Sequence, residues 1–534
     1  MLMRHIKADD IIFVQVDEDC DGYTSAALLI NYLNRLFPYF TQHNIIYRTH
    51  RFKEHGICVE EIPPEVRLVI VPDAGSSEYD KHEALAERGV DILILDHHNA
   101  EKSQPPHACL INNQTCNYPN KTLSGVGIVY KFCSYLDEIL KQNIADDFLD
   151  LVAIGMIADM IKLNNYETRE LISKGLANVK NPFIEGMVLQ NEFYLKGELT
   201  PHGVSFSIAP CVNAVARVGS FEERMLMLEA MLEFTAYEKI PSTKRGAKGQ
   251  EETKVEQACR NCTNIRNRQN KDRDNTLRIA EEMVKEQDLL QNPILFIQFQ
   301  DQEINENLTG LIANQIANTY NRPTLILNDV RKVEFDEETG EVTGEKDLWQ
   351  GSMRNIKGTR FSNFQKFLQD SNLIEWCQGH SNAAGVAIPK DKIEELKVYC
   401  KQHLNESDFT PTYQVDLEIE AGNLNPADIL TLGEMKHVWG DGVEEPLICV
   451  RNLPINASIL DFLKGTTVKI SPTNTDGLTY IMFKTDEKVY NSLYSEQGVV
   501  TIDLVGKCAR NDWNGKPQVI IEDFEIVRRQ QYYF

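Results

Sequence analysis

The stretch "IIFVQVDEDCDG", residues 11–22, joins a short apolar run to a crowd of acidic residues. Its first six residues are typical of a buried strand, and Asp17, Asp19 and Asp21 follow them at alternate positions. Like charges a few ångströms apart raise one another's pKa and lower the stability of a folded protein. The stretch is therefore either a solvated loop or a place where a positive species binds.

The first third of the chain repeats the pattern of an apolar strand followed by a helix. "RLVIVPD" (67–73) and "DILILDHH" (91–98) are two further β-rich runs, and other segments place apolar residues at helical spacing. Strands that alternate with helices indicate an α/β fold with a doubly wound parallel sheet. The helices are expected at residues 24–37, 82–89, 124–140 and 146–161.

Each of the three predicted strands ends in residues that can bind a metal ion. Asp73 follows the second strand, and Asp96, His97 and His98 end the third. Functional groups gather at the carboxyl ends of parallel strands. A mixed set of carboxylates and imidazoles can hold two divalent ions about 4 Å apart, which polarise a phosphoryl group and generate hydroxide from water. Asp159, in the apolar segment "IGMIADM", is a further candidate ligand; the alternative is an aspartate at a helix end or one held by hydrogen bonds.

The composition is that of a soluble globular protein with more than one domain. Of the 534 residues, 42% are hydrophobic and 25% are charged, and a chain of this length exceeds a single core, which predicts two to four domains. No apolar run approaches the ~18 residues of a membrane span, and the first residues lack the apolar core of a signal peptide, so a cytoplasmic protein is expected. The net charge of −24 argues against a broadly basic surface for nucleic acid but is compatible with a basic groove.

The twelve cysteines follow no regular frame. The CxxC pair Cys259 and Cys262 lacks a second pair at zinc spacing, so structural zinc is the less favoured alternative. Free thiols in a reducing compartment are the expected state.

Residues 236–291 are polar and basic overall, and they predict a loop that leads into a long exposed helix joining two domains. A solvated connector is the favoured interpretation, and a surface that faces phosphate is the alternative. The basic residues that would serve such a surface are Lys244, Arg245, Lys248, Arg266 and Arg268.

The second half of the chain predicts another α/β unit and a final β domain. Apolar runs at 293–299 and 322–327 flank a helical pattern at 308–320, and residues 334–352 predict a surface hairpin that leads into a strand. Residues 499–527 predict two strands joined by an Asn-Gly turn, and short strands of this kind indicate a small β-barrel.

Four segments resemble, in order and spacing, the motifs of the DHH phosphoesterase superfamily: "DEDCDG", "VPDAGS", "LDHHNA" and "IGMIADM". Further segments resemble RecJ-type single-strand-specific 5′→3′ exonucleases, namely "THRFKEHGI" (49–57), "LSGVGIVYKF" (123–132), "APCVNAVARVGS" (209–220), "QGSMRNIKG" (350–358), "CQGHSNAAGVAI" (377–388) and two segments near the C-terminus. The chain departs from the family pattern at Gln378 and Ala216, which replace glycines, at "KEHG" (53–56), and at residues 331–348, a hairpin without a counterpart.

The resemblance implies a centre with two metal ions, with manganese expected and magnesium as the alternative. The implied ligands are Asp17, Asp19, Asp73, His97 and Asp159. Asp21 and His98 would be ligands or partners that orient the ligands, and Asp96 would complete the catalytic set. Glu18 and Cys20 are expected to be spacers.

The resemblance also implies that Arg51, Ser352 and Arg354 bind the 5′-phosphate at the end of a strand. A guanidinium makes two parallel hydrogen bonds to a phosphate, and a hydroxyl adds a third. The implied substrate-binding set also contains Asn213, Arg217 and His380, of which the last two are candidates for contacts to the scissile or a neighbouring phosphate. The alternative for His380 is a histidine satisfied within a glycine-rich turn.

The implied architecture has four parts. These are a doubly wound DHH domain (1–235), a connector with a long helix (236–291), a smaller α/β DHHA1 domain (292–408) and a C-terminal OB-like β-barrel (409–534). The DHHA1 domain would close over a cleft too narrow for a duplex. Trp513 would either stack on a base, as aromatic residues of OB domains do, or pack in the core.

The implied function is a metal-dependent exonuclease of DNA repair and recombination that degrades single-stranded DNA, with RNA as an alternative substrate. It would work from the 5′ end and release 5′-mononucleotides without a covalent intermediate. A single-strand-binding protein or a helicase is the expected kind of protein partner, with no membrane partner. One alternative is a related phosphodiesterase that cuts short oligonucleotides or cyclic dinucleotides, and another is a non-catalytic scaffold of a replication or repair complex, which the intact acid and histidine set disfavours.

Overall fold

The computed structural model describes all residues except 52–54, 301–303, 336–341, 474 and 532–534. Internal contacts divide the chain into two compact units. The first unit joins Met1–Arg266 with Val415–Phe534, and the second comprises Asn267–Gln414. The division into four domains expected from the sequence stays a prediction. Lys53 and Glu54 of the "KEHG" departure and the tip of the 331–348 hairpin lie outside the described residues.

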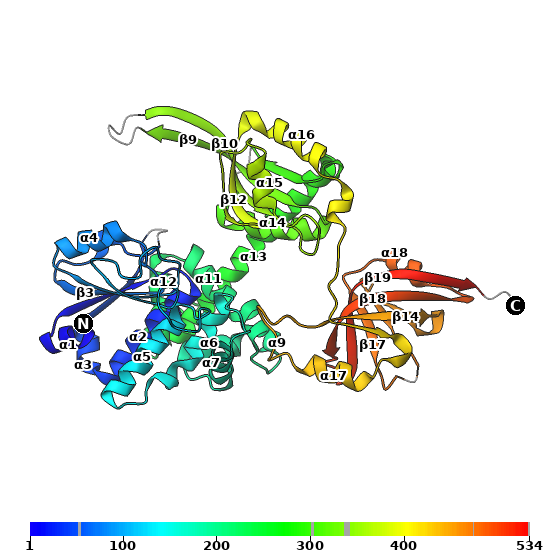
Figure 1. The fold of residues 1–534 in the computed structure, drawn as a ribbon. Helices are drawn as coiled ribbons and strands as arrows, with labels where there is room; N and C mark the ends of the chain where they lie inside the picture. The colour runs from blue at the N-terminus through cyan, green and yellow to red at the C-terminus, as the bar shows by residue number, and fades with distance from the viewer. Residues whose placement is uncertain (52–54, 301–303, 336–341, 474, 532–534) are drawn as a thin grey trace. The chain divides into compact units, whose positions relative to one another are not determined.

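A five-stranded parallel sheet forms the centre of the N-terminal part (Figure 1). Its strands are β1 (Ile11–Val16), β2 (Ile45–Thr49), β3 (Val66–Pro72), β4 (Asp91–Asp96) and β5 (Cys109–Asn112). The strand order β2-β1-β3-β4-β5 runs outward from β1 in both directions, which is the doubly wound arrangement expected from the sequence. The three strands predicted from apolar runs are confirmed, and the two edge strands β2 and β5 were missed.

Helices cover both faces of this sheet. The helices α2 (Cys20–Leu36), α5 (Gly125–Leu140) and α6 (Leu149–Ala158) share a core with Val14 and its face of the sheet, whereas α4 (Tyr79–Glu87) shares a second core with Phe13. Successive side chains of a strand point to opposite faces, so β1 contributes to both cores. The other helices of this part are α1 (Leu2–Ala8), α3 (Pro38–Asn44), α7 (Tyr166–Ala177), α8 (Pro182–Gln190), α9 (Glu192–Leu195), α10 (Pro201–Gly203), α11 (Ala209–Val218) and α12 (Phe221–Met231), followed by the ribbon of β6 (Lys239–Pro241) and β7 (Glu251–Thr253).

The long connecting helix expected from the sequence is α13 (Lys254–Glu286). It is not solvated along its whole length, because its first turns bury Cys259, Cys262 and Ile265 in the N-terminal core. Its last turns bury Ala280 and Val284 in a core of the second unit. The helix is thus amphipathic at both ends.

The second unit is a mixed five-stranded sheet with helices on both faces. Its strands are β8 (Leu295–Phe299), β9 (Thr324–Phe335), β10 (Val342–Arg354), β11 (Trp376–His380) and β12 (Ala383–Pro389), in the order β11-β12-β10-β9-β8. Helix α14 (Glu306–Tyr320) packs on one face, and α15 (Phe364–Asp370) and α16 (Ile393–His403) pack on the other. The described parts of β9 and β10 pair beyond the sheet as a long hairpin, which confirms the hairpin expected at 334–352 (Figure 1).

The C-terminal part of the first unit is a seven-stranded sheet with the order β13-β14-β18-β19-β17-β16-β15. Its strands are β13 (Leu417–Glu420), β14 (Leu447–Ile455), β15 (Leu460–Leu463), β16 (Thr467–Ile470), β17 (Thr479–Phe483), β18 (Gly498–Arg510) and β19 (Pro517–Gln531), and its helices are α17 (Pro426–Glu434) and α18 (Glu487–Leu493). The OB-like domain expected from the sequence is present, but its sheet is not closed into a barrel, because within the described residues the short edge strands β13 and β15 each pair on one side only. Among the helices of the described chain, none is long and apolar enough to cross a membrane.

Candidate metal centre

The acidic residues predicted from the strand ends come together at the carboxyl edge of the N-terminal sheet. The strands β1, β3 and β4 are parallel neighbours, so the residues that follow them emerge side by side. Three sets of side chains could each hold a metal ion, and the candidate ligand atoms within each set lie within 4.8 Å of one another. The sets are Asp73, Asp96, His97 and His98; Asp21, His97 and Asp159; and Asp17, Asp19 and Asp73.

The three sets share members and form one continuous site. Asp73 belongs to two of them, and so does His97. The Nε2 atom of His97 lies 3.3 Å from Asp73 Oδ1 and 3.6 Å from Asp159 Oδ2. Burial lowers the pKa of His97, which favours the neutral imidazole that binds metal ions.

Asp73 gives the clearest sign that a cation completes the site. Its Oδ1 atom is buried and has no hydrogen-bond partner in the described part of the chain. Burial, followed by the charges of Asp21 and Asp19, raises the pKa of this carboxyl well above its usual value. A buried carboxylate oxygen that accepts no hydrogen bond destabilises a fold. The surrounding carboxylates and imidazole are the donors that suit a divalent ion, so the residues present fit a metal.

Asp19 and Asp159 are two further carboxyls of the site whose pKa values are raised. Burial, with repulsion from Asp21 as the next cause, raises the pKa of Asp19 to about 6 and that of Asp159 to about 7. Asp159 lies at the C-terminal end of α6, where the helix dipole disfavours a negative charge. It is therefore both a helix-end residue and a member of the cluster. Metal binding at this site would displace protons from such carboxyls.

Asp21 is held by the N-terminus of α5. Its Oδ1 accepts hydrogen bonds from the Ser124 hydroxyl at 2.9 Å and the Val126 amide at 3.2 Å, and its Oδ2 accepts one from the Gly125 amide at 2.7 Å. Backbone amides at a helix N-terminus stabilise a carboxylate. Both oxygens are therefore engaged in positioning Asp21, and a direct contact to metal stays a prediction.

Asp96 is the buried anchor of the Asp-His-His segment. Its Oδ1 accepts hydrogen bonds from the His97 amide at 2.7 Å and from His98 Nδ1 at 2.8 Å, and its Oδ2 accepts one from the Ser76 amide at 3.1 Å. Burial acts to raise the pKa of Asp96, but the hydrogen bonds outweigh it and lower this pKa below its usual range. The hydrogen bond with Asp96 raises the pKa of His98 to about 9. Asp96 thus holds the backbone of His97 and orients the ring of His98.

Two glycines make room for the carboxylates. A Cβ atom at Gly125 would collide with the side chain of Asp73, and one at Gly155 would lie 2.7 Å from Asp21 Oδ1. The approach of α5 and α6 to the site therefore depends on the absence of these side chains. Gly125 lies in the segment "LSGVGIVYKF" (123–132), which resembles a family motif, but no local sequence pattern predicts its contact with Asp73.

Of the predicted substrate-binding residues of the first unit, one makes a structural hydrogen bond and two are exposed arginines. Asn213 Oδ1 accepts a hydrogen bond from the Cys20 amide at 2.9 Å, so it fixes the start of α2. Arg217 lies one turn later on α11 and is exposed. Arg51 follows β2, the neighbour of β1, and its side chain is 59% exposed.

Glu18 is not the spacer expected from the sequence. Its buried side chain forms an ion pair with Arg224 of α12, which is 206 residues away in the chain. Burial raises the pKa of Glu18 to about 7, although the charge of Arg224 lowers it. No local sequence signal indicated this partner.

In the second unit, Ser352 and Arg354 lie on one face of β10 beside the start of α14. The Ser352 hydroxyl oxygen is 2.8 Å from that of Thr309, and a Cβ atom at Gly310 would collide with the Arg354 guanidinium. Burial lowers the pKa of Arg354. Among the described residues no carboxylate pairs with this guanidinium, so the half-buried charge suits an anion. Thr309 and Gly310 were missed by the sequence analysis.

His380 shares this face of the sheet. The strand register places His380 opposite Ala383, and Ala383 opposite Arg354. The His380 ring is exposed, and the described residues offer it no hydrogen-bond partner, which disfavours the alternative of a satisfied structural histidine. Gln378, which departs from the family pattern, lies two residues before it on β11 and is also exposed.

The exposure of Trp513 and the burial of Cys259 and Cys262 bear on two further alternatives left open by the sequence. Trp513 is 99% exposed in the turn between β18 and β19, so the alternative of a core tryptophan is wrong. The thiols of Cys259 and Cys262 are buried and contact the Phe183 carbonyl and the Met227 sulfur, each at 3.6 Å. All twelve cysteines are free, as expected.

Part of the basic connector serves the fold. Arg266 donates hydrogen bonds to the carbonyl oxygens of Phe206 and Ser207, both at 2.7 Å. Lys244 lies 3.3 Å from a carboxylate oxygen of Glu252. These two residues therefore have structural partners, whereas Arg245 and Lys248 are exposed.

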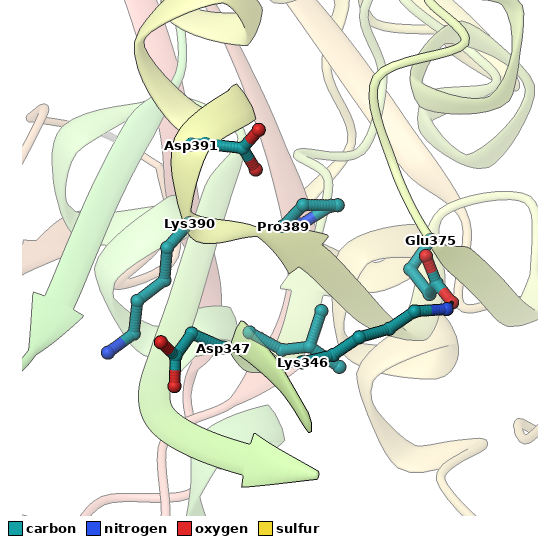
Figure 2. A pocket seen from close by; sticks show the side chains of 7 residues that line it. Lys346, Asp347, Glu375, Pro389, Lys390 and Asp391 are labelled. Atoms are coloured by element: carbon teal, nitrogen blue, oxygen red, sulfur yellow. Dashed lines mark hydrogen bonds and ion pairs between the residues drawn. The ribbon is translucent and has the colours of Figure 1, made fainter. Parts of the chain in front are cut away.

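A separate hollow of about 480 Å³ lies at the base of the β9–β10 hairpin (Figure 2). It is lined by Lys346, Asp347, Leu348, Glu375, Pro389, Lys390 and Asp391. Figure 2 shows Lys346 reaching to Glu375, with 2.8 Å between the nitrogen and the carboxylate oxygen. Lys390 pairs with Asp329 at 2.5 Å. Since both lysines are matched by carboxylates, this hollow lacks the unbalanced charge of the metal centre.

Family models and a structural match agree on the class of protein. Residues 11–156 match the model described as the N-terminal domain of the DHH family, and residues 415–523 match the RecJ OB domain. The crystal structure of RecJ from Thermus thermophilus in complex with Mn²⁺ has the same fold, with a TM-score of 0.69 at 19% identity over 98% of this chain and 70% of that chain. The fold is thus that of a DHH-domain protein with a RecJ-type OB domain.

The relatives narrow this class to one family. The SPbeta prophage-derived protein YorK of Bacillus subtilis strain 168, named as a single-strand DNA-specific exonuclease, is 38% identical over 99% of this chain and 90% of its own length. The single-stranded-DNA-specific exonuclease RecJ of the same organism is 25% identical over 99% of this chain and 63% of its own length. The chain belongs to the RecJ family of DHH-domain nucleases, which confirms the resemblance and the enzyme class inferred from the sequence.

The raised carboxyl pKa values predict how the metal-free protein responds to pH. Asp19 and Asp159 bind protons more tightly in the folded than in the unfolded state, so their contribution to stability is present at low pH and is lost as pH rises from about 4 to about 7. We expect the melting temperature of the metal-free protein to fall across this interval and to be restored by Mn²⁺ at neutral pH. Thermal denaturation with and without Mn²⁺, measured across this pH interval, tests the prediction. A melting temperature that Mn²⁺ does not change at pH 7 would contradict it.

The close approach of α5 predicts a specific effect of Gly125→Ala. Alanine favours a helix by about 1 kcal/mol over glycine, but here its Cβ would displace the Asp73 side chain. We expect the variant to lose about 1–3 kcal/mol of unfolding free energy and to bind Mn²⁺ more weakly by titration calorimetry. Gly127→Ala in the same helix, whose Cβ would lie 3.1 Å from that of Leu123, is the control. Equal Mn²⁺ affinities in the two variants would count against the assignment.

Proposed function

We propose that this protein is a metal-dependent exonuclease that removes 5′-mononucleotides from the 5′ end of single-stranded DNA. The observation that carries the proposal is the continuous set of carboxylates and imidazoles around Asp73 Oδ1, a buried atom that accepts no hydrogen bond within the described residues. The names of the YorK and RecJ relatives support single-stranded DNA as the substrate. DNA repair and recombination are the cellular processes that we infer from the family.

We propose that Asp17, Asp19, Asp73, His97 and Asp159 hold two divalent ions. Mn²⁺ is the favoured ion and Mg²⁺ the alternative, since RecJ of Thermus thermophilus is known in complex with each. The ions would supply polarisation of the scissile phosphoryl group and activation of water. Asp96 and Asp21 would keep the ligands oriented through their backbone hydrogen bonds.

The chain's basic residues would bind the strand. Arg354, which has no carboxylate partner among the described residues, and the Ser352 hydroxyl would bind the terminal 5′-phosphate on the face of β10. Arg51 is the further guanidinium that we propose for binding of a terminal phosphate. Arg217 and His380 would contact phosphates near the scissile bond, and Trp513 would stack on a base farther along the strand. We expect single-strand-binding protein or a helicase as partners in the cell.

A phosphodiesterase for short oligonucleotides or cyclic dinucleotides is the second candidate. The match of residues 415–523 to the RecJ OB domain favours action on longer strands. A series of 5′-labelled strands of increasing length separates the two candidates. Faster turnover of two- to five-residue substrates than of long strands would reject the exonuclease, and release of label as mononucleotides from long strands would support it.

Replacement of the central ligand tests the metal centre. We expect Asp73→Asn to abolish Mn²⁺-dependent hydrolysis, because it removes the carboxylate that belongs to two of the three sets. The variant should retain binding to single-stranded DNA by fluorescence anisotropy and should lose the rise in melting temperature caused by Mn²⁺. Unchanged turnover would refute the ligand assignment, and full turnover with Mn²⁺ absent would refute metal dependence.

The anion site on β10 predicts a selective loss. We expect Arg354→Ala to raise KM about tenfold or more for 5′-phosphorylated strands. The KM for strands with a 5′-hydroxyl should stay nearly unchanged. Arg331→Ala, on the distant part of the hairpin where Arg331 pairs with Asp347 at 3.2 Å, is the control of equal charge. Equal losses on both substrates would remove the terminal-phosphate role from Arg354.

A further inference from the structure

The ion pair between Glu18 and Arg224 is almost completely withdrawn from water. The side chains are 5% and 8% exposed, respectively. A buried ion pair contributes little net stability compared with apolar residues of similar volume. Glu18 belongs to none of the three metal-binding sets, so the pair has no direct use in holding a cation. The contacts of the pair indicate that it positions another residue.

Arg224 connects this pair to the segment that carries Arg51. One terminal nitrogen of Arg224 binds Glu18, and the other, Nη2, donates a hydrogen bond to the Arg51 carbonyl oxygen at 3.1 Å. The Arg51 amide donates to Glu61 Oε1 at 3.3 Å, so both sides of this residue's backbone are held. The Arg51 side chain is only loosely held, with its Nε 3.9 Å from the same Glu61 oxygen.

Helix α12 supplies a second contact to the same residue. The Arg51 guanidinium carbon lies 5.7 Å from the ring centre of Phe221. Phe221 and Arg224 are three residues apart in α12 and therefore lie on the same face of the helix. One face of α12 thus holds the Arg51 backbone through a hydrogen bond from Arg224. The same face places the Phe221 ring beside the Arg51 guanidinium.

Farther along the chain, the backbone amide of Gly56 contacts a candidate metal ligand. The Gly56 amide donates a hydrogen bond to Asp17 Oδ1 at 3.2 Å, and the Ile57 amide donates one to Glu78 at 2.7 Å. Asp17 therefore contacts Gly56, and its neighbour Glu18 contacts the Arg51 backbone through Arg224. Among the described residues, the contact that reaches Arg51 itself from the first acidic loop is the one through Arg224.

We propose that the Glu18–Arg224 pair is a positioning device that fixes Arg51 at the rim of the metal centre and so sets the preference for a strand with a terminal phosphate. This inference rests on the proposed function of Arg51. Neither member of the pair touches the reacting atoms, so the pair acts on recognition of the strand end. A guanidinium displaced by about 1 Å loses its alignment with a phosphate, and misplacements of this size change rates by up to about a hundredfold.

The test compares Arg224→Met, Arg51→Ala and the double variant on strands with a 5′-phosphate or a 5′-hydroxyl. We expect Arg224→Met to raise KM for the phosphorylated strand about tenfold and to change kcat less than about twofold. The double variant should lose no more of the phosphate preference than Arg51→Ala alone, because both changes remove the same contact. Arg224→Lys, which keeps the charge but lacks the second nitrogen, should fall between wild type and Arg224→Met.

Arg35→Met is the matched control. It also removes a guanidinium bonded to carboxylates of the same domain, those of Asp147 and Glu233, each at 2.6 Å. We expect it to lower the melting temperature without changing the phosphate preference. A purely structural role for Arg224 would give the same result in Arg224→Met, and that outcome would overturn the proposal. Additive losses in the double variant would also overturn it.

Hydrogen–deuterium exchange separates failure of this inference from failure of the proposed function. We expect Arg224→Met to speed exchange of amides at residues 48–51 and 55–61 and to leave those of α5 unchanged. If Arg51→Ala keeps the phosphate preference, the proposed function of Arg51 fails, and this measurement alone decides whether the pair positions the segment. Unchanged exchange in Arg224→Met would reject the positioning role whatever the activity shows.

Discussion

Mutual repulsion among buried carboxylates is the constraint around which the N-terminal part of the molecule is arranged. The parallel order of β1, β3 and β4 brings three acidic strand ends to one edge. Backbone amides offset much of the repulsion, with the start of α5 bound to Asp21 and the Asp-His-His segment folded around Asp96. The Oδ1 atom of Asp73 receives no such donor among the described residues. The fold therefore leaves this carboxylate for a cation to neutralise, at a residue that belongs to two of the three sets of candidate ligands.

The parts of the fold that could be predicted are those whose signal is local. β1 and β4 are apolar runs bounded by polar residues, and both were placed within two residues of their observed ends. β2 and β5 were missed, since β2 is partly exposed and β5 is four residues long, and neither shows a clear period. The C-terminal strands were expected from their turns, but closure of a sheet depends on pairing between distant strands, which local patterns do not contain.

The candidate site shows the same limit. Strand ends identified which residue types gather at the edge, an acid within an apolar segment indicated Asp159, and the family resemblance supplied the residues of the second unit. Partners across the fold could not be predicted, as in the contact of Glu18 with Arg224 or of Ser352 with Thr309. Such pairs join side chains that are tens to hundreds of residues apart, and their identity follows from packing. The sequence indicated Trp513 as an aromatic residue near a turn, but it did not predict whether the side chain is exposed or packed in the core.

The long β9–β10 hairpin bears on how the protein behaves at high concentration. β9 pairs with β8 only as far as Asn328, and β10 pairs with β12 only from Leu348 onward. Beyond these residues, the described parts of both strands have one edge without a neighbour, and such edges promote strand pairing between molecules. Charged pairs across the ribbon, such as Arg331 with Asp347, cover its surface with ionised groups that oppose stacking. We therefore expect colloidal stability to depend on the ionisation of the part of the hairpin beyond the sheet, which carries none of the residues proposed to bind substrate.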